Sequence, residues 1–170
     1  IGLMLMILGK KFYGVDKIII VEPSESRRNM ALDLGADIVI DPTVQDPVAM
    51  VMNTTDNQGA QAIFTACPVI ETHKQAIKMV AKRGGVIFFG GVPKDEPEIS
   101  LLSNFIHYRE AYITGSHGST PEQHKTALNL IANKSVDISS LVSESVPLSD
   151  IMRGFELAAS GKLAKVMVTP

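Results

Sequence analysis

Residues 17–40 read KIIIVEPSESRRNMALDLGADIVI, and this stretch decides the fold. The β-branched run that opens it predicts a strand too apolar for a sheet with one solvated face, because such a sheet would alternate apolar and polar residues. A helix is expected over 24–34, with Ser24 as its N-cap and Gly35 as its C-terminal stop. A second short strand follows at 38–40. Strand, helix and strand in this order predict a parallel βαβ unit.

The same alternation continues to the end of the chain. We expect further strands at 62–65, 86–89, 111–114 and 164–168, and helices at 3–13, 46–53, 70–82, 121–133 and 148–160. Thr120 is the candidate N-cap of the helix at 121–133. The pattern therefore predicts an α/β fold built on a doubly wound parallel sheet with helices on both faces. Only the segment 137–147, rich in Ser and Val, interrupts the rhythm.

Composition limits the classes of partner. A chain of 170 residues with 45% hydrophobic residues can bury one ordinary core. Its net charge is −2 with both signs spread along the chain, which argues against a nucleic-acid partner. The single cysteine, Cys67, excludes an internal disulfide framework and a Cys-rich zinc site, and fits a cytoplasmic location. The apolar opening 1–8 is too short to span a bilayer and lacks the basic flank of a signal peptide, so no membrane partner is expected.

Glu22 is the first candidate for a binding role. In a doubly wound sheet, ligands bind beyond the carboxyl ends of the strands, and Glu22 directly follows one of them. A carboxylate there can accept hydrogen bonds from the adenosine ribose of NAD and repel the extra phosphate of NADP. It lies 20 residues after Gly2, which opens an apolar helix whose N-terminus could bind a pyrophosphate. The alternatives are a solvated acid in a turn and a glycine that serves packing alone.

Two further groups could contribute to the same edge. Gly90 and Gly91 end the strand at 86–89, where a backbone without Cβ atoms can approach a flat nicotinamide ring or simply form a turn. Arg27 and Arg28 lie in the first turns of the helix after Glu22. One of them could stack on adenine or reach a phosphate, and the other is expected to be solvated.

The histidines show no metal-binding spacing, and no metal site is predicted in this chain. His73, His107, His117 and His124 are each expected at the surface or at a helix cap. His117 is of interest because it follows the strand at 111–114. Cys67 follows another strand, but no base partner can be named that would make it a nucleophile.

Several segments, taken in order, resemble the zinc-type medium-chain dehydrogenases/reductases, the family of the alcohol and sorbitol dehydrogenases. The resemblance is carried by Ile1-Gly2-Leu3, Val21-Glu22-Pro23-Ser24-Glu25-Ser26-Arg27, Leu34-Gly35-Ala36-Asp37, Lys82-Arg83-Gly84-Gly85 with Phe88-Phe89-Gly90-Gly91, and Gly154-Phe155-Glu156 with Gly161-Lys162 and Lys165-Val166. It covers nearly the whole chain and implies a Rossmann fold.

The resemblance also implies an activity and a set of contacts. It implies an NAD-dependent enzyme, a dimer or tetramer, that transfers a hydride from a small secondary alcohol or polyol to NAD. It implies cofactor contacts at Ile1, Gly2, Glu22, Arg27, Phe89, Gly90, Gly91, Ser116 and His117. Related polyol dehydrogenases often have an arginine where this chain has Gly118, which weakens the case for the nicotinamide side. The family's zinc is held by a separate preceding domain, so no catalytic residue is assigned here.

The resemblance places the first, central strand of the sheet before Ile1, so we expect a Rossmann fold truncated before that strand. Residues 1–136 would be a partial dinucleotide-binding domain, and 137–170 a segment that returns towards the catalytic domain. Such a piece is expected to be inactive and not to fold alone as a normal Rossmann domain. Burial of the apolar side chains of the central strand would contribute about 6–15 kcal/mol, as much as the whole net stability of a domain. The alternatives are a nucleotide-sensing module without chemistry and a zinc-free reductase of the quinone oxidoreductase type.

Overall fold

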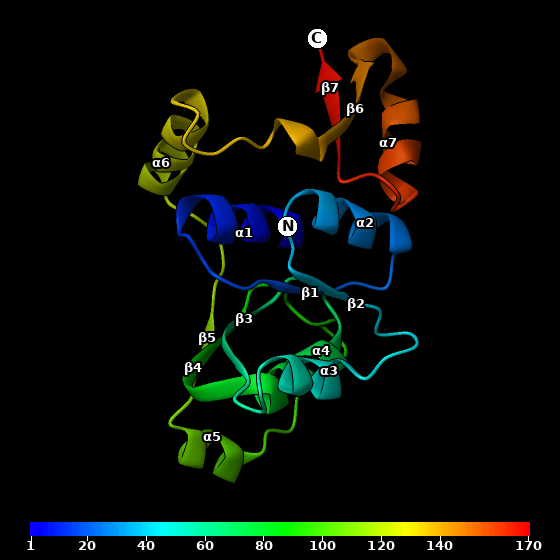
Figure 1. Cartoon of the computed structure of the whole chain (residues 1–170). Coiled ribbons are helices and arrows are strands. Elements are labelled where there is room, and N and C mark those ends of the chain that lie inside the picture. The colour runs from blue at the N-terminus through cyan, green and yellow to red at the C-terminus, as the bar shows by residue number, and fades with distance from the viewer. The chain divides into compact units, whose positions relative to one another are not determined.

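The computed structural model describes residues 1–170 and resolves them into two compact units. The first unit contains residue 1 with 3–43 and 120–170, and the second contains residue 2 with 44–119. The elements of each unit can be followed by colour in Figure 1. None of the helices has the length and apolar character that crossing a bilayer requires.

The first half of the first unit is a parallel βαβ unit preceded by a helix. Its elements are α1 (Gly2–Ile7), a π-helical turn (Leu8–Phe12), β1 (Ile19–Val21), α2 (Glu25–Asp33) and β2 (Ile38–Ile40). The two strands run parallel, with Val21 opposite Ile40 at their carboxyl ends. Buried side chains of α1 and α2 form the core with Val136 and Leu141. The helix predicted from residue 3 therefore exists, but its last five residues are π-helical.

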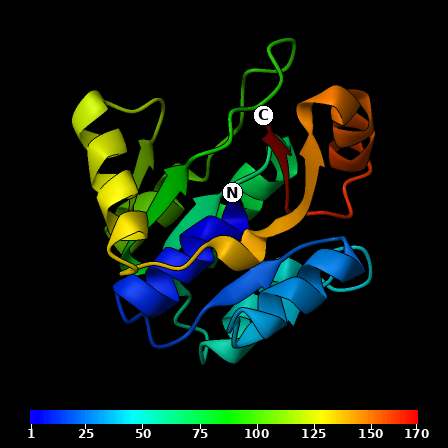
Figure 2. The ribbon, with the colours of Figure 1, turned by 90° about the horizontal axis from the view of Figure 1, so that it is seen from above.

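The second half of the first unit contains a strand that the sequence analysis did not predict. Its elements are α6 (Pro121–Ala132), a 3-10 turn (Ser139–Leu141), β6 (Val142–Pro147), a second 3-10 turn (Leu148–Asp150), α7 (Ile151–Ala159) and β7 (Lys165–Thr169). β6 and β7 pair in parallel and α7 packs on both (Figure 2). Gly154 permits this approach, since a Cβ there would lie 2.9 Å from the Val146 Cγ2 atom. β6 was missed because its apolar residues are too few to stand out.

The second unit is a three-stranded parallel sheet with its helices. Its elements are α3 (Pro47–Thr54), β3 (Ala60–Thr65), α4 (Ile70–Met79), β4 (Val80–Phe88), α5 (Ser103–Arg109) and β5 (Tyr112–Gly115). The strand order is β3-β4-β5, so β4 is central. Ala76, Val80 and Val86 form its buried core. Helix α5 was not predicted.

Helix α4 ends three residues earlier than its sequence pattern predicts. The backbone becomes extended at Val80, which pairs with Ala60 in β3. Gly59, at φ +85°, makes this possible, because a Cβ on it would overlap the Met79 carbonyl and the backbone of Val80. The close passage of the chain at Gly59 thus converts the last turn of the predicted helix into strand.

Two predicted helix caps have different outcomes. Thr120 forms a full capping box: its hydroxyl accepts from the Gln123 backbone N–H, while the Gln123 side chain accepts from the Thr120 N–H. Ser24 occupies the N-cap position of α2, but its hydroxyl makes no capping hydrogen bond. Helices interleaved with parallel strands confirm the predicted α/β class. The domain boundary at 136 stays a prediction.

Candidate functional site

Glu22 lies where the carboxyl ends of β1 and β2 meet. Its backbone N–H donates to the Ile40 carbonyl at 3.1 Å, which extends the strand pairing by one residue. Its Oε1 atom accepts from the Ser24 backbone N–H at 2.9 Å. The carboxylate is partly buried, and its Oε2 atom has no protein hydrogen bond. Glu22 is therefore a fixed carboxylate with one oxygen available to a ligand.

Arg28 fixes the turn in which Glu22 stands. Its Nη1 atom donates to the Glu22 carbonyl at 2.8 Å and to the Pro23 carbonyl at 2.7 Å. Its Nη2 atom lies 2.9 Å from the Asp41 Oδ2 atom, and the two side chains are only 15% and 21% exposed. The expectation that one of the two arginines is solvated is thus wrong for Arg28. Arg27, one residue earlier on α2, makes no protein hydrogen bond or ion pair.

Asp41 is the carboxylate that directly follows β2, and sequence reasoning missed it. Its Oδ1 atom accepts from the Thr43 hydroxyl at 2.6 Å and from the Thr43 N–H at 2.9 Å. The two hydrogen bonds from Thr43 hold the pKa of Asp41 below its usual value; desolvation opposes them, and the charge of Arg28 adds a smaller lowering effect. Asp41 is therefore ionised at neutral pH. Its position directly after the second strand, as Glu22 follows the first, was the sequence signal that could have placed it at the same edge of the sheet.

The second group of predicted residues lies at the carboxyl edge of the β3-β4-β5 sheet. The Gly90 N–H donates to the Thr65 carbonyl at 2.6 Å, just past the end of β4. The Ser116 N–H donates to the Phe88 carbonyl at 3.0 Å, just past the end of β5. Phe89 is 38% exposed, and His117 is exposed beside Ser116. The structure thus brings these predicted residues to one edge of one sheet.

The two glycines at this edge are not equivalent. A Cβ on Gly90 would lie 2.7 Å from the Cys67 carbonyl oxygen, so close packing on the Cys67 backbone requires glycine there. A Cβ on Gly91 would meet nothing within 4 Å. Gly90 therefore has a structural reason independent of any ligand, whereas Gly91 presents open backbone.

The two predicted contact residues at the start of the chain are less constrained by their surroundings. Gly2 opens α1, as predicted, but a Cβ on it would lie 3.9 Å from the Ala66 Cβ atom, an ordinary contact distance. Close packing therefore does not demand glycine at this position. Ile1 is 57% exposed.

His73 contradicts the expectation that every histidine lies at the surface or at a cap. It is 4% exposed on α4, and its ring stacks on Phe88 with centroids 4.3 Å apart. The Nε2 atom lies 3.1 Å from the Thr65 hydroxyl. Burial lowers the pKa of His73, and a hydrogen bond to the Gly90 backbone partly offsets this. The apolar stripe of the helix around residue 73 was the signal that it faces inward.

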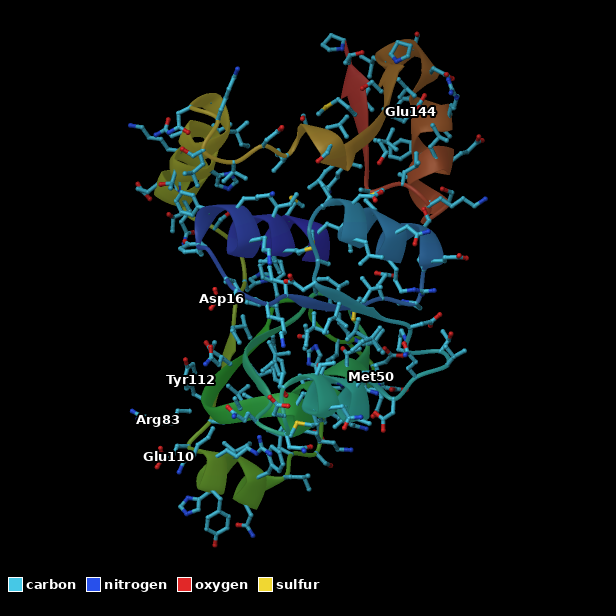
Figure 3. All side chains as sticks on the ribbon, viewed as in Figure 1. Asp16, Met50, Arg83, Glu110, Tyr112 and Glu144 are labelled. Carbon is cyan, nitrogen blue, oxygen red and sulfur yellow. The ribbon has the colours of Figure 1, made fainter.

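An exposed ion pair lies at the other end of the strands of the same sheet. Arg83 and Glu110 form an ion pair at 3.7 Å, and their side chains are 81% and 61% exposed. Figure 3 shows both side chains near Tyr112, away from the carboxyl ends of the strands. Such an exposed pair contributes little.

The residues of this chain do not provide a zinc site. No three His, Cys, Asp or Glu side chains lie together in a way that could hold a metal ion. Cys67, the single thiol, lies 3.5 Å from the Thr72 hydroxyl.

Comparison with known proteins identifies relatives. Residues 1–133 match the family model described as zinc-binding dehydrogenase. The chain is 29% identical over 163 residues to the L-threonine 3-dehydrogenase of Thermococcus kodakarensis, covering 94% of this chain and 46% of the relative. It is 27% identical over 170 residues to the sorbitol dehydrogenase of Halalkalibacterium halodurans, covering 100% of this chain and 49% of the relative. The chain thus spans about half the length of these relatives.

A solved structure supports the same architecture. A zinc-binding dehydrogenase structure from Sinorhizobium meliloti, solved with NADP bound, superposes with a TM-score of 0.89 at 24% identity. That alignment covers 99% of this chain and 49% of the solved one. At this identity the likeness concerns the fold, which is that of the Rossmann-type half of such enzymes. The family match over residues 1–133 shows that this chain belongs to the zinc-binding dehydrogenase family.

Proposed function

We propose that this chain is the NAD-binding portion of a zinc-dependent alcohol or polyol dehydrogenase that transfers a hydride from a secondary alcohol to NAD. The observation that carries the proposal is the Glu22 carboxylate, which is fixed at the carboxyl end of β1 with one oxygen available. A carboxylate in this position can accept from ribose hydroxyls and disfavours a 2′-phosphate. The relatives named above are dehydrogenases.

The proposal gives each group of residues a role in binding. Glu22 would orient the adenosine ribose, and Arg27 would meet a phosphate or the adenine face, since its guanidinium has no protein partner. Ile1 and Gly2 would lie near the pyrophosphate at the start of α1.

At the other end of the cofactor, the open backbone of Gly91 and its neighbours Phe89 and Gly90 would accommodate the nicotinamide ring, with Ser116 and His117 beside them. When bound, NAD would supply the hydride acceptor. The chain's own part is to hold and orient it.

The remaining features of the proposal concern the whole protein. Zinc would be held by residues outside the 170 described, because no cluster within them fits it. The substrate would be a small alcohol or polyol, and the protein a cytoplasmic dimer or tetramer. Residues 1–136 would form part of the dinucleotide-binding domain and 137–170 would return towards the catalytic domain; the family match ends close to that boundary, at residue 133. These 170 residues alone would be inactive.

Cofactor titrations of the full-length protein test the proposal. Like charges about 5 Å apart repel by roughly 3 kcal/mol at an effective dielectric constant of about 20, and salt reduces this. We therefore expect Glu22→Gln to improve NADP binding relative to NAD by about tenfold. Glu25→Gln, an exposed neighbour on α2, is the matched control and should leave the ratio unchanged. An unchanged NAD/NADP ratio in Glu22→Gln would remove Glu22 as the determinant, and a wild-type protein that binds neither nucleotide would refute the function.

A further inference from the structure

The buried imidazole of His73 has no part in the proposed binding site, yet it lies directly behind it. Its ring is stacked on Phe88 at an interplanar angle of 15°, so the last residue of β4 covers one face of it. Its Nε2 atom is 3.1 Å from the hydroxyl of Thr65, the last residue of β3. One side chain on α4 therefore contacts the carboxyl ends of two neighbouring strands.

The contact with Thr65 also connects the imidazole to the loop that follows β4. The Gly90 N–H donates to the carbonyl of Thr65, whose hydroxyl lies 3.1 Å from the His73 Nε2 atom. The opposite side of Gly90 packs on the Cys67 backbone, where no Cβ fits. Thr65 and Cys67 thus both restrain Gly90, and His73 contacts Thr65. A buried polar group satisfied in this way resists displacement, because breaking one bond leaves another group without a partner.

We propose that His73 is a positioning residue for the nicotinamide end of the cofactor: it touches no ligand, but it holds the segment 89–91 in the conformation that binds the ring. This inference rests on the proposed function. Burial lowers the pKa of His73, which favours the neutral ring, and its Nε2 atom shares a hydrogen bond with the Thr65 hydroxyl.

A positioning role for His73 predicts different effects on ligands with and without the nicotinamide ring. Loss of the imidazole contacts loosens segment 89–91 but does not alter Glu22, whose hydrogen-bond partners are Ser24, Ile40 and Arg28. NADH carries the nicotinamide ring, and ADP-ribose lacks it. A positioning role therefore weakens NADH binding and leaves ADP-ribose binding unchanged, whereas general destabilisation weakens both.

The experiment measures dissociation constants of NADH, by nicotinamide fluorescence, and of ADP-ribose, by calorimetry, in the full-length protein. His73→Leu keeps an apolar side chain in place and removes the hydrogen bond to Thr65. We expect a rise of about tenfold in the NADH constant and less than about twofold for ADP-ribose. His73→Gln keeps a donor and an acceptor and should recover part of the loss. His107→Leu, which changes an exposed histidine on α5, is the matched control.

Thr65→Val keeps the test decisive should His73→Leu fail to fold, because it removes only the hydroxyl that His73 contacts. It should raise the NADH constant a few-fold and spare ADP-ribose. Equal weakening of both ligands, or no change in either, would overturn the role of His73 while leaving the proposed function intact. A wild-type protein that binds ADP-ribose and NADH with no measurable affinity would refute the proposed function, and the inference with it.

Discussion

Replacement of Arg28 by alanine should destabilise the protein strongly, although Arg28 lies on the surface helix α2. The change removes two charge-assisted hydrogen bonds to the carbonyls of Glu22 and Pro23 and leaves Asp41 without its cation. Each such bond contributes about 1.5–3 kcal/mol, and Asp41 also loses its cation. Because one side chain makes all these contacts, the terms are not additive.

We expect a combined loss of about 3 kcal/mol, mainly from the two hydrogen bonds that Arg28 donates. For a domain of this size, that corresponds to a melting temperature about 6–12 °C lower. Thermal unfolding of the full-length protein, followed by circular dichroism, measures it.

Arg27→Ala provides the matched control on the same helix. Arg27 makes no protein hydrogen bond or ion pair, so its removal should change stability by no more than about 0.5 kcal/mol while weakening cofactor binding. Arg28→Ala combined with Asp41→Asn should cost less than the sum of the two single changes. Equal melting temperatures for Arg27→Ala and Arg28→Ala, or strict additivity of the double variant, would refute the reasoning.

Three further outcomes follow from the described contacts. The pKa of Asp41 is lowered in the folded state. The contribution of Asp41 to stability is therefore fully present above the unfolded pKa of about 3.9 and is lost as pH falls through the lower folded pKa. The difference in melting temperature between wild type and Asp41→Asn should shrink below about pH 4. Gly90→Ala should destabilise by about 1–3 kcal/mol because its Cβ would overlap the Cys67 carbonyl, whereas Gly91→Ala should be neutral in urea unfolding. Thr120→Ala should cost about 1 kcal/mol in the same assay through loss of the capping box at α6.

The sequence predicted the strands well where apolar runs were continuous. The runs that became β1, β2 and β4 are bounded by Gly, Pro or charged residues, and each forms a parallel strand. β6 was missed because its two valines, Val142 and Val146, are separated by Ser, Glu and Ser, a pattern also typical of loops. Helix α5 was missed because it has only seven residues and no side-chain cap. The end of α4 depended on a tertiary contact at Gly59 that no local pattern contains.

Some residues of the candidate site could be named from the sequence, and others could not. Glu22, Gly90 and Gly91 could be named because their positions after strands are a local property of the sequence. The partners of Arg28 and of His73 could not, because Asp41 and Thr65 come near only through strand register and helix packing. Residue type alone made both side chains look like surface groups.

The Arg28–Asp41 pair has a consequence for redesign of nucleotide preference. The Arg28 guanidinium already lies next to Glu22, but three oxygen atoms of the protein bind it, so it is not available to a phosphate. Neutralising Glu22 would therefore abolish a repulsion without creating an attraction. A strong preference for the phosphorylated dinucleotide in this scaffold would have to come from Arg27 or from a newly introduced basic side chain, with Arg28 left unchanged.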